Sequence, residues 1–315
     1  MQAFATIIRR LRVGAPADEL GPFLTRLALP SYAVIGLVLG LGLIALEAQG
    51  FFISLRAFQT LALFGYFVGT AMLVRRIGYP RFATGMESLA VIYGQGLAGF
   101  FLLIPGAALA FPLQDGLLDR MDKALGLDWP AYTHALAPAL RLLWPAYASF
   151  TLQPTVLIVV LASTGRLVAC WRLATAGALA LLMTALVFPF FPAVGEFAFH
   201  GIAPSAYPGM TASSTPFEFV PILLKIRSGY RILDASIAGG IVSFPSYHAA
   251  SAAIFTWAAW RLKFLRWPFV ALNIMLLLGA PILGSHYFVD LIAGLTIAVV
   301  SICLARRWVP NLESV

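Results

Sequence analysis

Long apolar stretches are the feature that most limits what this chain can fold into. Eight of them approach or reach the length that a helix needs to cross a bilayer, roughly 17–25 residues. With 61% hydrophobic and only 11% charged residues, the chain is far from the composition of a soluble domain. We therefore predict an all-α, polytopic membrane helical bundle of about eight spans. The predicted spans are 31–46, 60–74, 88–109, 142–162, 173–191, 248–262, 267–283 and 286–305.

The distribution of basic residues predicts the orientation of this bundle. If the N-terminus is cytoplasmic, 14 of the 21 basic residues fall on the cytoplasmic side, while the acidic residues gather in the outer segments. This alternation holds at every turn and places both termini in the cytoplasm. The net charge of +8 could suggest a nucleic-acid partner, but the basic residues form small clusters at the ends of apolar runs. We predict no nucleic-acid binding.

We divide the chain into three parts. Residues 1–28 are predicted to form a cytoplasmic amphipathic segment, and 29–191 the N-terminal transmembrane helices, with an outer interfacial segment near 112–140. Residues 192–315 hold an outer loop and the catalytic transmembrane helices. In the interfacial segment Leu117, Leu118, Met121 and Leu125 repeat at helical spacing, so we expect them to face the membrane.

Two histidines, His248 and His286, lie at the starts of predicted spanning helices, on the outer side of the membrane. His286 and Asp290 are four residues apart, so on a helix they share a face, and an unpaired carboxylate in an apolar span is costly. A carboxylate bonded to one imidazole nitrogen leaves the other nitrogen free for nucleophilic attack. The alternative interpretation is a structural Asp–His pair that only locks helices together.

The other histidine, His248, ends the stretch Ser243-Phe-Pro-Ser-Tyr-His. Pro245 and its serines are typical of a helix start, where backbone N–H groups attract anions such as phosphate. Ser246 adds a hydroxyl, and His248 could give a proton to a leaving oxygen. The alternative is an ordinary helix cap.

Three cations lie in the outer loop before these blocks. Lys225, Arg227 and Arg231 could bind a phosphoryl group, or could form an interfacial patch that meets anionic lipid headgroups. We interpret the remaining histidines, His134 and His200, as surface or interfacial residues.

The blocks Pro245-Ser-Tyr-His248 and His286-Tyr-Phe-Val-Asp290 resemble the type 2 phosphatidic acid phosphatase superfamily. The sequence around these two blocks is most similar to the inositol phosphorylceramide synthase (aureobasidin-resistance) branch, and the similarity extends from Lys225 onward. The phosphatase branch has Ser-Arg before the nucleophilic histidine, where this chain has Gly279-Ala280. It also has Arg-Pro in its first block, whereas Arg231 is followed by isoleucine. Both departures favour the transferase-like branch.

The resemblance implies that His286 forms a phosphohistidine, that Asp290 orients it and that His248 protonates the leaving group. It implies a phospholipid donor, a lipid or water acceptor, no metal and no cofactor. We therefore expect a membrane lipid phosphotransferase that moves a phospho-head group to a sphingolipid or other lipid alcohol. We place it in a bacterial inner membrane with its site facing the periplasm.

Two other functions stay open. The first is a lipid phosphate or polyprenyl diphosphate phosphatase, which differs in whether water is the acceptor. The second is a proton-coupled transporter, which would need ionisable residues near the middle of several spans.

Overall fold

The computed structural model of the chain describes residues 17–76, 79–203, 206, 215–234, 237 and 240–310, and it is 79% helical. Its strands are the parallel pair β1 (Phe52–Ile53) and β2 (Ile232–Leu233). The predicted all-α class is confirmed. The helices are α2 (Ala17–Ala48), α3 (Leu55–Arg76), α4 (Pro80–Ala108), α5 (Asp115–Ala124), α6 (Trp129–Leu136), α7 (Leu140–Ala148), α8 (Gln153–Ser163), α9 (Leu167–Val187), α10 (Glu196–Phe199), α11 (Thr215–Arg227), α12 (Tyr247–Ala259), α13 (Arg266–Leu283) and α14 (Phe288–Trp308).

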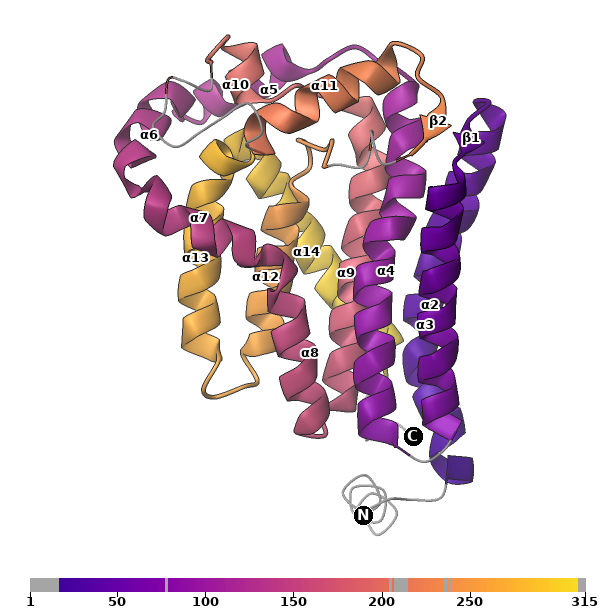
Figure 1. The fold of residues 1–315 in the computed structure, drawn as a ribbon. Coiled ribbons are helices and arrows are strands. Elements are labelled where there is room, and N and C mark those ends of the chain that lie inside the picture. Colours follow the sequence, from indigo (N-terminus) through magenta and orange to yellow (C-terminus); the bar gives the residue numbers. More distant parts are fainter. Residues whose placement is uncertain are drawn as a thin grey trace.

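The long helices run side by side and alternate in direction, while the short helices α5, α6, α10 and α11 gather at one end (Figure 1). There α5, α10 and α11 lie across the ends of the bundle, and we call this the loop-rich end. The turns at 164–166 and 260–265 lie at the opposite end. The described parts of the segments predicted to be outer loops thus lie on one side of the bundle.

Among the described residues, five helices are long and apolar enough to cross a membrane. They are α2 from Phe23, α4, α9, α13 and α14, and a bent pair of segments would make a sixth span. The predicted span 142–162 is therefore not one straight helix, because Trp129–Thr151 and Gln153–Ser163 meet at 54°. Pro154 near the start of α8 lacks a backbone N–H, which interrupts the helical hydrogen bonds at this bend. The predicted spans 60–74 and 248–262 correspond to the helices α3 and α12. These two helices are not among the five that are long and apolar enough to cross a membrane.

The first helix also begins earlier than predicted. Since α2 starts at Ala17, residues 17–28 belong to that helix and not to a separate surface segment. Residues 1–16, which include the predicted amphipathic stretch, lie outside the described part.

Helix α9 forms the centre of the bundle and packs against α2, α4, α8, α12 and α14. Its small residues bring these neighbours close, and its buried Arg172 donates to the carbonyl oxygen of Val309 at 3.1 and 2.9 Å, just after α14. Another buried charge, Glu87 of α4, accepts hydrogen bonds from Tyr32 and Arg75. Glu87 is paired with an arginine and Arg172 is hydrogen-bonded to a backbone carbonyl oxygen, as burial of a charge requires.

Candidate active site

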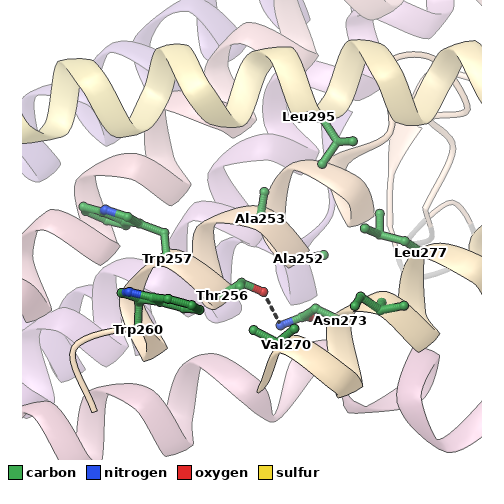
Figure 2. A pocket seen from close by; sticks show the side chains of 10 residues that line it. Ala252, Ala253, Thr256, Trp257, Trp260, Val270, Asn273, Leu277 and Leu295 are labelled. Atoms are coloured by element: carbon green, nitrogen blue, oxygen red, sulfur yellow. Dashed lines mark hydrogen bonds between the residues drawn. The ribbon is translucent and has the colours of Figure 1, made fainter. Parts of the chain in front are cut away.

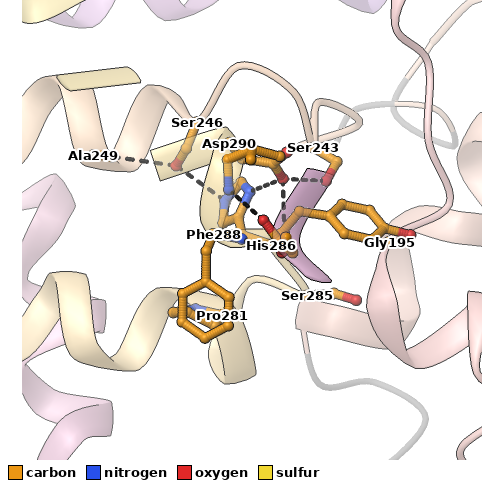
Figure 3. A network of polar contacts seen from close by, with 12 residues as sticks. Gly195, Ser243, Ser246, Ala249, Pro281, Ser285, His286, Phe288 and Asp290 are labelled. Carbon is orange, nitrogen blue, oxygen red and sulfur yellow. Dashed lines mark hydrogen bonds and ion pairs between the residues drawn. The ribbon is translucent and has the colours of Figure 1, made fainter. Parts of the chain in front are cut away.

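At the loop-rich end, the start of α14 holds a buried carboxylate network (Figure 3). Oδ2 of Asp290 accepts hydrogen bonds from Ser243 Oγ at 2.7 Å and from the backbone N–H of Tyr287 at 3.0 Å. Nδ1 of His286 lies 3.1 Å from the same oxygen. These three contacts to one carboxylate oxygen fix the orientation of the carboxylate and of the imidazole ring. The predicted pairing of His286 with Asp290 is confirmed.

The geometry of this pair differs from the prediction in one respect. His286 precedes α14, because Tyr287 is the extended N-cap residue and the helix begins at Phe288. Asp290 is therefore the third helical residue, and it reaches back to the N-cap backbone as in a capping box. The two side chains meet through a helix start and not along one helical face.

The second nitrogen of His286 faces the first histidine block. Nε2 lies 3.3 Å from Ser246 Oγ, and this oxygen also accepts the N–H of Ala249 at 3.2 Å, as the N-cap of α12. With Nδ1–H directed at Asp290, Nε2 carries the lone pair and the Ser246 hydroxyl donates to it. The predicted helix start at Ser246 is confirmed, but its own N–H is already occupied by the carbonyl oxygen of Asp290 at 3.0 Å.

A glycine allows the two blocks to meet. A Cβ added at Gly294 on α14 would run into the carbonyl oxygen of Ser246 and come within 3.1 Å of Ala249 Cβ. Only glycine permits this close approach of α14 to the start of α12. The approach brings the rings of His248 and His286 to 5.9 Å between centroids.

Aromatic side chains surround His248, and the sequence analysis did not find them. The ring stacks on Tyr147 of α7 at 4.7 Å and lies 4.5 Å from Phe150. The Tyr147 hydroxyl is buried and has no hydrogen-bond partner among the described residues. A Cβ built on Gly284 would lie 2.7 Å from this hydroxyl and 2.6 Å from His286 Cδ2, so the hydroxyl lies beside both histidines. No sequence pattern near Tyr147 indicates that its hydroxyl lies beside the two histidines.

Helix α5 presents its acidic face to the protein, and of the residues predicted to face the membrane Leu118 is buried inside the protein. Asp115, Asp119 and Asp122 are buried together with Leu118, whereas Met121 and Leu125 are exposed. The burial follows from hydrogen bonding, because Asp122 accepts the N–H groups of Phe288 and Val289 at 2.7 and 2.8 Å. Asp122 thus caps the N-terminus of the helix that carries Asp290.

Asp115 plays a similar part for the chain before α10. It accepts the N–H groups of Val194 and Gly195 at 3.1 and 2.9 Å, and the hydroxyl of Tyr287 at 2.8 Å. Burial raises the pKa of Tyr287, so this hydroxyl stays protonated and remains a donor.

Crowded carboxylates at this end hold their protons more tightly than usual. Burial raises the pKa of Asp122 to about 6, although its two backbone donors act in the opposite direction. Burial together with the charge of Asp122 raises the pKa of Glu196 to about 9. Burial also raises the pKa of Asp115.

The three predicted phosphate-binding cations occupy different settings. Arg231 donates to the carbonyl oxygens of Ile226 and Tyr230 at 3.0 and 3.1 Å, and Lys225 lies over the ring of Tyr230. These contacts fit a structural role at the end of α11. Arg227 donates through Nη2 to the carbonyl oxygen of Phe111 at 2.9 Å. Its Nη1 is buried and finds no hydrogen-bond partner in the described part of the chain.

The two remaining histidines differ from each other. His134 is exposed on α6, as predicted. His200 follows α10, and its Nε2 lies 2.9 Å from Glu196 Oε2, so it is not an ordinary surface residue.

An apolar groove opens beside α12 (Figure 2). It has a volume of about 440 Å³ and runs between α12 and α13, with Leu295 of α14 at its edge. Its polar side chains are Thr256 and Asn273, and Nδ2 of Asn273 donates to Oγ1 of Thr256 at 3.1 Å; Trp257 and Trp260 also line the groove. The groove begins at Ala252, one helical turn beyond His248.

A family model described as the PAP2 superfamily matches residues 117–304, more than half of the chain. The chain belongs to the PAP2 superfamily. No curated protein and no solved structure matches it. Membership supports a phosphatase or phosphotransferase type of activity on lipid phosphates in a membrane.

The PAP2 match is wider than the resemblance that the sequence motifs suggested. It begins within α5, so it includes the acidic helix that caps α14 as well as both histidine blocks. It supports the superfamily and not the inositol phosphorylceramide synthase branch within it.

Proposed function

We propose that the chain is a lipid phosphotransferase that uses His286 as its nucleophile, at a site facing the periplasm of a bacterial inner membrane. The observation that carries the proposal is the state of the His286 ring. Nδ1 is held by Asp290, and Nε2 lies 3.3 Å from the Ser246 hydroxyl. A neutral imidazole held in this tautomer is a competent nucleophile at neutral pH.

The reaction proceeds in two balanced steps. Nε2 of His286 attacks the phosphorus of a phospholipid, a P–N bond forms, and the bond from phosphorus to the leaving oxygen breaks as His248 gives that oxygen a proton. The acceptor hydroxyl then attacks phosphorus, its proton passes to His248, and the P–N bond breaks. Asp290 carries no proton through the cycle but stabilises the charge that forms on the ring.

Arg227 is the strongest candidate for the phosphate ligand among the three cations. Its Nη1 is a buried donor without a hydrogen-bond partner among the described residues, and an anionic phosphate oxygen would satisfy it. Arg231 and Lys225 contribute positive charge nearby on the chain, and the hydroxyl of Ser246 would donate to a phosphoryl oxygen once Nε2 is phosphorylated.

The apolar groove supports a lipid substrate. An acyl chain lying along α12 in this groove would place its head group toward the end of α12 that carries His248. The departures at Gly279-Ala280 and after Arg231 favour a lipid alcohol, including a sphingolipid, as acceptor.

The decisive experiment uses purified protein with three labelled substrates: phosphatidic acid, a polyprenyl diphosphate, and phosphatidylinositol with ceramide. Each is assayed with and without EDTA, alongside His286→Ala and the matched control His134→Ala. Free phosphate identifies a phosphatase and a new phospholipid a transferase, whereas His286→Ala should abolish either product. Activity that survives in His286→Ala would overturn the proposal. Trapping an acid-labile, base-stable phosphoenzyme and inhibition by vanadate would support it.

A further inference from the structure

A second polar cluster lies at the loop-rich end, between α5 and α10. It consists of Asp119, Glu196 and His200, and their ligand-type atoms all lie within 4.8 Å of one another. Nε2 of His200 is 2.9 Å from Glu196 Oε2 and 3.7 Å from Asp119 Oδ1. None of the three belongs to the set of groups that the proposed reaction uses.

Glu196 is the unusual member of this cluster. It is fully buried, and apart from the 2.9 Å contact between its Oε2 and Nε2 of His200, neither of its carboxylate oxygens accepts a hydrogen bond within the described part of the chain. A buried carboxylate without donors is costly, and such groups in folded proteins call for a bound ion or water. The neighbouring Asp115 and Asp122 are different, because each has backbone N–H donors.

We propose that Asp119, Glu196 and His200 form a binding site for a divalent transition-metal ion, with Zn²⁺ as the ion that fits best. One imidazole with two carboxylates is a donor set that suits zinc, and water would complete a tetrahedron. Ligand atoms around such an ion lie about 3.4 Å apart when each bond is about 2.1 Å. The separations of 2.9 and 3.7 Å already bracket that value.

The proposed ion clamps the elements that hold the nucleophile. Its ligands come from α5 and from α10 with the residue after it, and both elements contact the backbone around His286. The backbone N–H of Glu196 donates to the carbonyl oxygen of Ser285 at 3.3 Å, and that of Phe197 donates to Ser285 Oγ at 3.1 Å. Ser285 has a φ of 55°, a strained conformation that these contacts sustain just before His286. The role of the ion is structural and requires no contact with substrate.

The test measures metal binding directly. Full-length protein without a polyhistidine tag is purified in detergent, stripped with EDTA and titrated with Zn²⁺ by calorimetry, and its Tm is measured with and without the ion. Mn²⁺ and Mg²⁺ serve as comparison ions, and Co²⁺ provides an absorption spectrum that reports coordination. The variants are Glu196→Gln, Asp119→Asn and His200→Gln, and the matched controls are His134→Gln and Glu218→Gln, both at exposed positions.

We expect one Zn²⁺ per chain, a higher Tm with the ion, and a loss of affinity of at least about tenfold in each ligand variant. The controls should bind as the wild type does. Equal binding by wild type and Glu196→Gln, or a loss of binding in His134→Gln, would overturn the proposal. If one ligand variant fails to fold, the other two decide, because they replace different side chains. Since binding and Tm are measured without substrate, their outcome is independent of whether the proposed transferase activity is found.

Discussion

Two fully buried carboxylates at the same end of the bundle have opposite surroundings. Asp290 has one oxygen that receives three donors, from a hydroxyl, a backbone N–H and the His286 ring. Glu196 receives no hydrogen bond from the described residues and lies against His200 and Asp119. Burial alone therefore does not define what a carboxylate does here.

The difference teaches that the hydrogen-bond donors around a buried carboxyl group indicate how the protein uses that group. Asp290 is surrounded by groups that stabilise its charge, which suits an acid that must orient a histidine throughout a reaction. Glu196 is surrounded by other acids, and its pKa is raised to about 9, first by burial and then by the charge of Asp122. Asp290 thus has donors on Oδ2 but none on Oδ1 among the described residues, whereas Glu196 has none on either oxygen.

The largest expected effect comes from breaking the satisfied site. In Asp290→Asn the ring of His286 loses its charged partner and its preferred tautomer, so kcat should fall by roughly 10³–10⁴-fold. The measurement is the initial rate on whichever lipid phosphate the wild type turns over. Glu218→Gln, which removes an exposed carboxylate outside both sites, is the matched control. Loss of less than about tenfold in Asp290→Asn would mean that the pair is structural.

The sequence made the satisfied site visible because its partners are close along the chain. His286 and Asp290 are four residues apart, and an acid at the start of an apolar span stands out. The helix start at Ser246 was equally readable from Pro245 and the serines beside it. The bundle itself followed from the length of the apolar stretches, although the bend before α8 did not.

The partners of the other site are far apart in the sequence, so no spacing rule joins them. Asp119 and Glu196 come from different segments, and the apolar spacing in α5 predicts only that its leucines and Met121 face the membrane. Its aspartates are buried in the protein because the backbone N–H groups of Phe288 and Val289 need acceptors. That need arises only in the folded chain. The same holds for Tyr147, whose position beside the histidines depends on how α7 packs.

The next effect separates the two histidines. His248→Gln should lower kcat by roughly 10²–10⁴-fold on a lipid substrate, because the leaving alkoxide then departs without a proton. On 4-nitrophenyl phosphate, whose leaving group needs no proton, the loss should be much smaller, whereas His286→Ala should remain inactive on both. An equal loss on both substrates in His248→Gln would show that His248 does not act as the acid.

A smaller effect is expected on stability, where Asp122 and Asp119 of α5 can be compared in protein stripped of metal. Asp122→Ala leaves two N–H groups at the start of α14 without acceptors, which should cost about 1–2 kcal/mol and lower the Tm. Asp119→Ala removes a neighbouring carboxylate that accepts its hydrogen bond from the exposed side chain of Lys123 and lies 3.7 Å from His200, so its Tm should change little. Thermal melts of both variants in the same detergent decide the matter. A larger drop for Asp119→Ala would contradict the assignment of Asp122 as the cap.

The smallest expected effect concerns the Tyr147 hydroxyl, which resembles Glu196 in being buried without a hydrogen-bond partner among the described residues. Because Tyr147→Phe removes no hydrogen bond from the resting protein, its Tm should be unchanged. The hydroxyl lies beside His248 and His286, where it would donate to the substrate phosphate, so kcat/KM should fall about 3- to 10-fold, the contribution of one hydrogen bond. Steady-state kinetics together with a melt check both halves of this expectation. A lower Tm with unchanged kcat/KM would show that the hydroxyl serves packing, and an orphaned polar group would then not be a sign of function at this end of the bundle.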